Sequence, residues 1–151
     1  MGCTLVLNHT PVTDDGLAAL RRLPGLRKLS LSGTRVTDAR LDRVKELHDL
    51  EFLSLADTAV TDKGLERLKG LETLRELNLA GTAVSDKGLE QLKEYAGLLK
   101  LGLCHTKVTD KGLEALEGMA DLVEVDLRLD DVTEEAVKKL QAKRPDLKIS
   151  Y

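Results

Sequence analysis

The sequence predicts an α/β solenoid of about six coils, with a parallel sheet on one side and helices on the other. The first observation is a period: the phrase L-x-x-L-x-L opens at residues spaced 24 apart, namely Leu26, Leu50, Leu74 and Leu98, with a variant at Leu122. The second is that each coil contains two hydrophobic periods, and the third is that the coils fill the chain without a linker. One coil cannot bury its own apolar faces, so the coils must stack.

Each coil begins with a strand and continues into a short helix. In "LRELNL" the residues Leu77 and Leu79 alternate with polar ones, as in a half-buried strand. In "SDKGLEQLKEY" the residues Leu89, Leu92 and Tyr95 recur at a spacing of three, which places one apolar stripe on a helix. Neighbouring strands should therefore pair in parallel, with the leucines between sheet and helices.

We expect one domain over residues 1–151, divided into the coils 2–25, 26–49, 50–73, 74–97, 98–121 and 122–143. A charged segment then closes the C-terminal end: Pro145 stops the last helix, and a capping strand follows within 144–151. At the other end no such device is visible, and Gly2 replaces the first leucine. We expect an exposed N-terminal edge built by Leu5, Leu7, Val12, Leu17 and Leu20. Either repeats continue upstream in a longer protein, which we favour, or this edge pairs with another chain. We therefore expect a monomer, or a dimer through the uncapped N-terminal edge.

Charge and cysteine usage narrow the classes of partner and compartment. The formal net charge is −3, which gives no reason to expect nucleic acid, and no apolar segment approaches the ~20 residues of a membrane span. Cys3 and Cys104 lie four coils apart, about 19 Å at one strand spacing per coil, too far for a disulfide. Two free thiols indicate a reducing compartment, so we expect a cytoplasmic protein.

A recurring Thr-Asp pair precedes each helix and is best explained as a helix cap. It is formed by Thr13 and Asp14, Thr37 and Asp38, Thr61 and Asp62, Ser85 and Asp86, Thr109 and Asp110, and Thr133 and Glu134. A carboxylate ladder that binds cations is the alternative, but lysines 63, 87 and 111 follow the aspartates in the middle coils and offset their charge. Two other columns have structural interpretations: turn threonines that satisfy backbone groups, and glycines 16, 64, 88 and 112 that let the helix approach the sheet, with Arg40 as the exception.

No catalytic or metal-ligating constellation can be assembled from the remaining polar residues. His9 and His105 are four coils apart, and His48 lies on the helix side. Cys104 and His105 are neighbours on a strand and should point to opposite faces. We therefore expect no enzyme, no cofactor and no metal.

The strand positions that face away from the leucines should form the binding face. The candidate partner-binding residues on it are Lys28, Ser30, Phe52, Ser54, Glu76, Asn78, Lys100 and Arg128. Phe52 is the only phenylalanine in the chain, and the register places it between Lys28 and Glu76. An aromatic side chain among charges is typical of an interface hot spot, although single exposed apolar residues occur on every surface.

The coil pattern L-x-x-L-x-L-x-x-T-x-V-T-D-x-G-L-x-x-L-x-x-L resembles the leucine-rich repeat family over essentially the whole chain. It is most similar to the 24-residue, planctomycete-like bacterial type, with Thr where the commoner repeat has Asn or Cys. The resemblance implies a right-handed α/β horseshoe with a concave sheet. It also implies a non-catalytic scaffold that binds a protein. A segment of a larger regulatory or substrate-receptor protein and a structural spacer without a ligand are the alternatives, because this scaffold serves unrelated partners.

Overall fold

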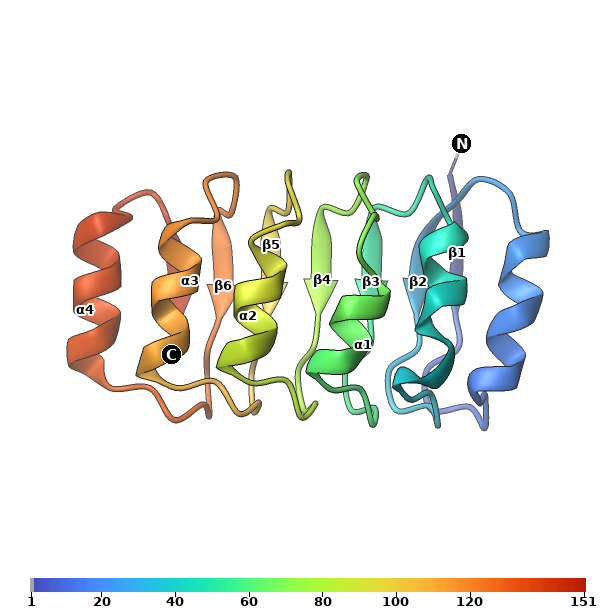
Figure 1. The fold of residues 1–151 in the computed structure, drawn as a ribbon, viewed down its shortest axis with the longest axis horizontal. Helices are drawn as coiled ribbons and strands as arrows, with labels where there is room; N and C mark the ends of the chain where they lie inside the picture. The colour runs from blue at the N-terminus through green and yellow to red at the C-terminus, as the bar shows by residue number, and fades with distance from the viewer. Residues whose placement is uncertain (1) are drawn as a thin grey trace.

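Seven strands form one parallel sheet in the order of the chain, as predicted (Figure 1). A computed structural model describes residues 2–151 of the protein. The strands are β1 (Cys3–Val6), β2 (Leu26–Ser30), β3 (Phe52–Ser54), β4 (Glu76–Asn78), β5 (Lys100–Gly102), β6 (Glu124–Asp126) and β7 (Lys148–Ser150). The expected fold class, a solenoid with a parallel sheet, is confirmed.

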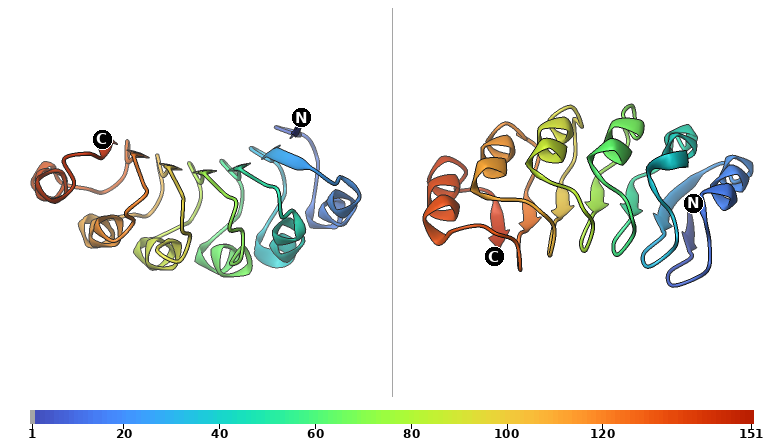
Figure 2. Two further views of the ribbon diagram at one scale, coloured as in Figure 1. Left: turned by 90° about the horizontal axis from the view of Figure 1, so that it is seen from above. Right: turned by 60° about the horizontal axis from the view of Figure 1, so that its bottom comes forward.

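Helices cover one side of this sheet, and Figure 2 shows that the strands line the concave side of the arc while the helices lie on its outer side. The first two coils use 3₁₀ helices and the later ones mainly α-helices. The helices are η1 (Asp14–Arg22), η2 (Asp38–Glu46), α1 (Asp62–Arg67), α2 (Asp86–Leu92), η3 (Asp110–Gly112), α3 (Leu113–Glu117) and α4 (Glu134–Lys143).

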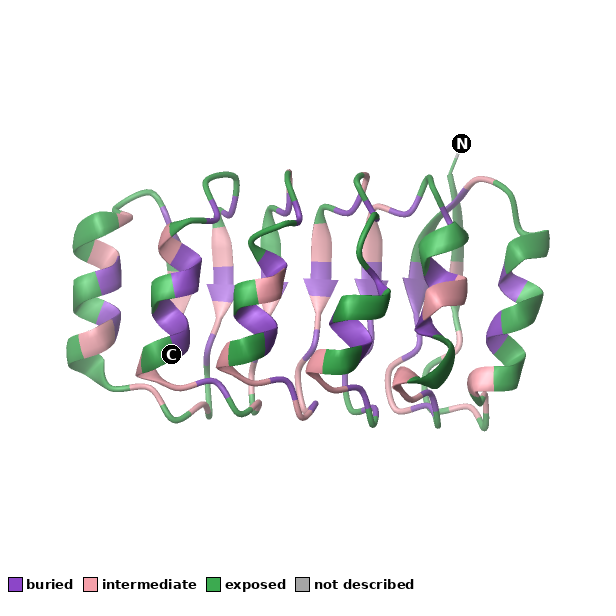
Figure 3. Cartoon of the chain, viewed as in Figure 1, coloured by how far each residue is buried: buried purple, intermediate pink, exposed green. Residues whose placement is uncertain are grey.

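Strand register is uniform from coil to coil, which turns repeat positions into columns. Leu29 pairs with Leu53 and then Leu77 on the inner face of the sheet, toward the helices. Lys28 pairs with Phe52 and then Glu76 on the opposite, concave face. The inner column belongs to a continuous core of aliphatic side chains, and its members are drawn as buried in β2 to β6 (Figure 3). The period of 24 therefore determines which side chains share a face.

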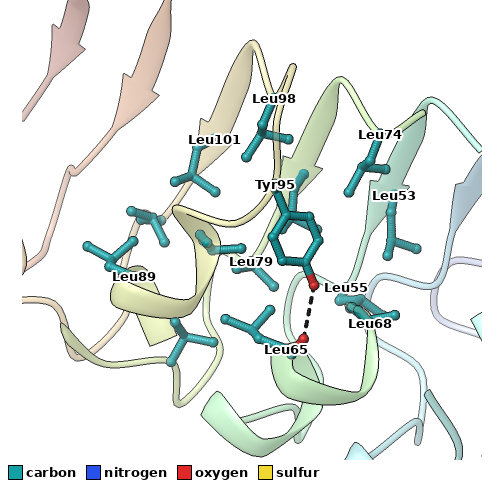
Figure 4. Packing of buried hydrophobic residues seen from close by; sticks show 14 of the residues in the cluster. Leu53, Leu55, Leu65, Leu68, Leu74, Leu79, Leu89, Tyr95, Leu98 and Leu101 are labelled. Carbon is teal, nitrogen blue, oxygen red and sulfur yellow. Dashed lines mark hydrogen bonds between the residues drawn. The ribbon is translucent and has the colours of Figure 1, made fainter. Parts of the chain in front are cut away.

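Tyr95 is the aromatic member of this core (Figure 4). It lies just beyond the end of α2, and its hydroxyl donates to the backbone oxygen of Leu65 at 2.9 Å, one coil back. Burial raises the pKa of the Tyr95 phenol, with a smaller contribution from the Glu94 charge. The buried hydroxyl is thus a neutral donor that joins two neighbouring coils.

The second coil departs from the others at Arg40, where most coils have glycine. Arg40 has non-helical backbone angles, φ −130° and ψ 21°, inside η2. In the next coil, a Cβ added at the equivalent Gly64 would lie 2.4 Å from a carboxylate oxygen of Asp38. We infer that the Cβ of Arg40 has no room in the regular helical geometry, so the backbone rotates there.

The two ends are built differently. At the C-terminal end, Arg144 donates to the backbone oxygens of Met119 at 2.9 Å and Leu122 at 2.7 Å, which holds the turn before β7 against the preceding coil. At the N-terminal end we expected an exposed apolar edge, and Leu5, Leu7 and Val12 of that edge are indeed only half-buried. The expectation was wrong for two residues at that edge, Leu17 and Leu20, which are 1% and 4% exposed because the second coil covers them.

Candidate partner-binding surface

The concave face consists of the outward positions of residues 4–8, 28–32 and 52–56, its N-terminal half, and of residues 76–80, 100–104 and 124–128, its C-terminal half. Lys28, Lys100 and Arg128 are exposed there, and Phe52 is half-buried. Glu76 and Asn78 are also half-buried. Six of the eight candidate residues are thus accessible to a partner.

The other two candidates, Ser30 and Ser54, lie in the floor of the N-terminal half, at 9% and 3% exposure. The Ser30 hydroxyl donates to Oδ1 of Asn8 at 2.5 Å, and the hydroxyls of Ser32 and Ser54 are 2.7 Å apart. The backbone N–H of Ser32 also donates to Oδ1 of Asn8, at 3.2 Å. These hydroxyls therefore satisfy one another and offer a partner a small, closed floor.

Charges on the C-terminal half are paired with one another. The ammonium of Lys100 lies 3.7 Å from the Glu76 carboxylate. The Arg128 guanidinium makes two bonds to the Asp126 carboxylate, at 2.9 and 2.7 Å, and lowers the pKa of that carboxyl group. At the end of the face, Lys148 lies 3.3 Å from Glu124.

Phe52 separates two shallow hollows on this face. One, of about 200 Å³, lies toward β1 and is lined by Thr4, Leu5, Val6, Lys28, Ser30 and Glu76 together with Phe52. The other, of about 210 Å³, lies over β4 to β6, where Gly102 keeps the floor low. Val6 is 61% exposed beside the first hollow. The aromatic ring and this valine make the N-terminal half the more apolar one.

The recurring aspartates join coils, which the sequence interpretation as helix caps did not anticipate. Asp62 accepts from the backbone N–H of Ser85 at 2.8 Å and from its hydroxyl at 2.6 Å, both in the following coil. Four further aspartates, at positions 14, 38, 86 and 110, repeat this pair of bonds. The capping interpretation holds for the threonine partners, of which Thr37, Thr61, Thr109 and Thr133 accept from an N–H in the first helical turn.

The glycines of the first helical turn make room for these carboxylates. A Cβ added at Gly64, Gly88 or Gly112 would lie 2.4 Å from Oδ1 of the aspartate in the preceding coil. The predicted close approach is therefore real, but it is directed at a neighbouring coil as much as at the sheet. The aspartate of one coil and the glycine of the next thus form one contact between coils. Both recurring positions, Asp and Gly, have a structural explanation.

Turn residues after the strands follow the predicted pattern with one exception. The hydroxyls of Thr10, Thr34, Thr58 and Thr82 each donate to a backbone oxygen three residues earlier, at 2.6 Å. Thr106 instead donates from its N–H and hydroxyl to Asp130, at 2.6 and 3.0 Å. Burial is the main cause that raises the pKa of Asp130, whose other carboxylate oxygen is buried without a partner among residues 2–151.

One exposed residue escaped the sequence reasoning. The residue that opens the turn has a positive φ in every coil, and it is Gly, His or Asp in the first five. In the sixth coil it is Leu129, with φ 62° and 79% exposure. A leucine is an unfavourable choice for the left-handed region. The signal was available, because this column of the repeat holds no other apolar residue.

Neither cysteine is in a disulfide: Cys3 is exposed and Cys104 is half-buried. Within residues 2–151, no three His, Cys, Asp or Glu side chains are placed to hold a metal ion. No helix of that range has both the length and the apolarity needed to cross a membrane.

Comparisons with known proteins agree with the geometry. The sequence profile of the family described as "Leucine Rich repeat" matches residues 46–69 and 70–93. No curated protein sequence matches the chain.

Three solved structures share the fold. An internalin (inlF) of Listeria monocytogenes is 18% identical with a TM-score of 0.68, over 97% of this chain and 46% of that one. Internalin C2 of the same species is 21% identical with a TM-score of 0.70, over 97% and 69%. A leucine-rich repeat protein of Leptospira interrogans is 21% identical with a TM-score of 0.68, over 98% and 36%. The chain thus spans less than half of two of these structures. Residues 46–93 therefore match the leucine-rich repeat family, and the chain shares the solenoid fold of these three structures.

Proposed function

We propose that the chain is a non-catalytic scaffold that binds a protein on its concave face. The observation that carries this proposal is Phe52, whose ring lies between two hollows on a face otherwise built from small and charged residues. Around it, the exposed and half-buried candidates supply the contacts: Lys28, Glu76, Asn78, Lys100 and Arg128. Ser30 and Ser54 support the floor rather than reach the partner. The concave face of a solenoid is the usual place for such contacts.

We further propose that residues 1–151 form one repeat domain, with residues 144–151 as its cap, and that it belongs to the bacterial, planctomycete-like repeat type. The bacterial origin of the structural neighbours supports the type. Since two neighbours are more than twice as long, the domain also suits a larger regulatory or substrate-receptor protein.

Two free thiols favour a cytoplasmic location, and trapping of Cys3 as a free thiol in intact cells would test it.

The N-terminal end supports either a monomer or a dimer. Within residues 2–151 no strand pairs with the outer edge of β1, and Leu5, Leu7 and Val12 are half-buried beside it. Pro11 carries no N–H, whereas Arg35, Ala83 and Lys107 at its repeat position each donate to the preceding coil. This loss of a donor is typical of a strand edge that faces solvent, so we favour a monomer. The mass in solution at micromolar concentration decides between them.

The proposal is tested by affinity capture with the wild-type chain and two variants. Phe52→Ala should lose the captured protein and keep the unfolding temperature, because the ring contributes to the surface and not to the core. Leu23→Ala is the matched control, since Leu23 is an apolar residue 41% exposed at the end of η1, away from the concave face. If wild type captures no protein specifically, the chain is a spacer. If both variants capture equally, binding occurs elsewhere.

A further inference from the structure

We propose that the N-terminal half of the concave face is the anchoring site, and that it accepts an extended segment carrying an apolar side chain close to a carboxylate. This inference rests on the proposed concave binding face and names the part of that face that binds and the chemistry of the partner. It depends on how charge and apolar surface are divided between the two halves.

The C-terminal half has little unsatisfied charge to offer. Its cations are engaged in ion pairs: Lys100 with Glu76, Arg128 with Asp126, and Lys148 with Glu124. A partner that lies on this half must displace these pairs or desolvate them, and neither step favours binding. The bidentate Arg128 pair is the most costly to break, because both of its bonds are under 3 Å.

The N-terminal half combines apolar surface with a floor whose hydroxyl groups already have hydrogen-bond partners within the chain. Phe52 and Val6 border the hollow of about 200 Å³, and the hydroxyls beneath it are bonded to one another and to Asn8. An apolar side chain that enters this hollow removes aromatic and aliphatic surface from water without leaving a buried polar group unpaired. Such a site favours an aliphatic or aromatic side chain over a polar one.

Lys28 then determines the sign of the charge that the partner carries. It is exposed, it lines the same hollow, and it makes no ion pair with any of residues 2–151. No carboxylate occupies an outward position of the first three strands. Glu76 on the fourth strand also lines the hollow, but its carboxylate lies 3.7 Å from the Lys100 ammonium. Lys28 is therefore the charged group at this hollow that has no ion-pair partner among residues 2–151, although the chain as a whole is negative.

The geometry also sets the spacing expected in the partner. Lys28 and Phe52 are paired residues on adjacent strands, about 4.8 Å apart. Successive residues of an extended segment advance about 3.3 Å and point to alternate sides, so side chains two positions apart, about 6.6 Å, share the side that faces both residues. The partner should therefore carry Asp or Glu two residues from its apolar anchor.

The test is a selection of displayed random dodecapeptides on the folded wild-type chain, followed by affinity measurement on synthetic copies of the enriched peptides. Enriched sequences should pair an apolar residue with Asp or Glu at that spacing. Phe52→Ala should lower the affinity of the chain for these peptides at least about tenfold, as expected for an anchor residue. A second selection on Lys28→Glu should enrich Lys or Arg in place of the acid.

Lys148→Glu is the matched control, because it is the same substitution in the same column five coils away, and its ion-pair partner Glu124 does not line the hollow beside Lys28. It should keep the acidic preference, and both variants should retain the wild-type circular dichroism spectrum. Peptides that bind wild type but respond to Lys148→Glu and not to Lys28→Glu would leave the concave face as the binding site and overturn its N-terminal location. Peptides unaffected by all three substitutions would contradict the concave face itself. If no sequence is enriched, the face does not bind a linear segment and the inference is wrong.

Discussion

Removal of the Asp62 carboxylate should destabilise the whole solenoid, because Asp62 joins two coils. Its two bonds to Ser85, at 2.8 and 2.6 Å, connect residues that are 23 apart in sequence. Hydrogen bonds to a charged acceptor contribute about 1.5–3 kcal/mol each. Asp62 and Ser85 are both half-buried, so water replaces part of the loss. We expect Asp62→Ala to cost about 2–3 kcal/mol.

Thermal and urea unfolding measure this cost. For a chain of this length, about 2–4 °C in Tm corresponds to 1 kcal/mol, so Tm should fall by about 4–12 °C. Asp15→Ala is the control: this carboxylate is 89% exposed and lies 3.6 Å from Arg40, so its loss should stay within about 0.5 kcal/mol. An Asp62→Ala variant as stable as Asp15→Ala would refute the coil-to-coil role of the aspartates.

A double-mutant cycle of Asp62→Ala with Gly88→Ala checks whether Gly88 makes room for the Asp62 carboxylate. The added Cβ would lie 2.4 Å from the Asp62 carboxylate, and 2.8 Å from the Val84 side chain. Gly88→Ala should therefore cost about 1–3 kcal/mol in the wild type and less in Asp62→Ala. The coupling free energy should exceed about 0.5 kcal/mol, and purely additive effects would show that Gly88 does not accommodate the carboxylate.

Four further outcomes can be checked by the same unfolding measurements. Arg144→Ala should lower stability by about 2–3 kcal/mol, because its guanidinium, on a side chain that is 11% exposed, donates to backbone oxygens of the preceding coil. Tyr95→Phe should cost about 1 kcal/mol, and an unchanged Tm would show that the bond to the Leu65 oxygen contributes nothing. Asp130→Asn should raise Tm by about 2 °C at pH 7, since burial raises the pKa of this carboxyl group and its charged form opposes folding; the gain should vanish once the pH is low enough to protonate the group. Bonds from the Thr133 N–H and hydroxyl lower the pKa of Asp110, so the stability that it contributes above the unfolded-state pKa of about 3.9 should be lost as the pH falls through the lowered value, and Asp110→Asn should flatten this acid limb.

Recurrence in the sequence was a reliable guide to the fold and a poor guide to the contacts between coils. The column of Lys28, Phe52 and Glu76 could be aligned from the period alone, because parallel strands in a solenoid pair at equal repeat positions. The aspartates were expected to cap their own helices, since capping is a local pattern. Their actual partners lie one coil further on, and only the stacking distance between coils reveals them.

The same limit applies to the candidate binding face, where the period predicts the positions of the residues but not their contacts. Periodicity placed all eight candidates on the outward side of the sheet, but it treated Ser30 and Phe52 alike. The structure separates them, since Ser30 is held in the floor by Asn8 while the Phe52 ring borders two hollows. Leu129 was missed although its column holds no other apolar residue, because the positive φ that makes a leucine unfavourable there is visible only in the structure.

The sequence by itself determined the solenoid, the register of its strands and the leucines of its core, because a hydrophobic period that no coil can bury alone leaves stacking as the only solution. Only the tertiary structure decided which carboxylate joins which coil, which serines are closed off, and which cations remain without an ion pair. These properties depend on distances between side chains of neighbouring coils, and a repeat pattern carries no information about such distances. The unpaired Lys28 beside Phe52 is a property of this kind, and the proposed partner chemistry follows from it.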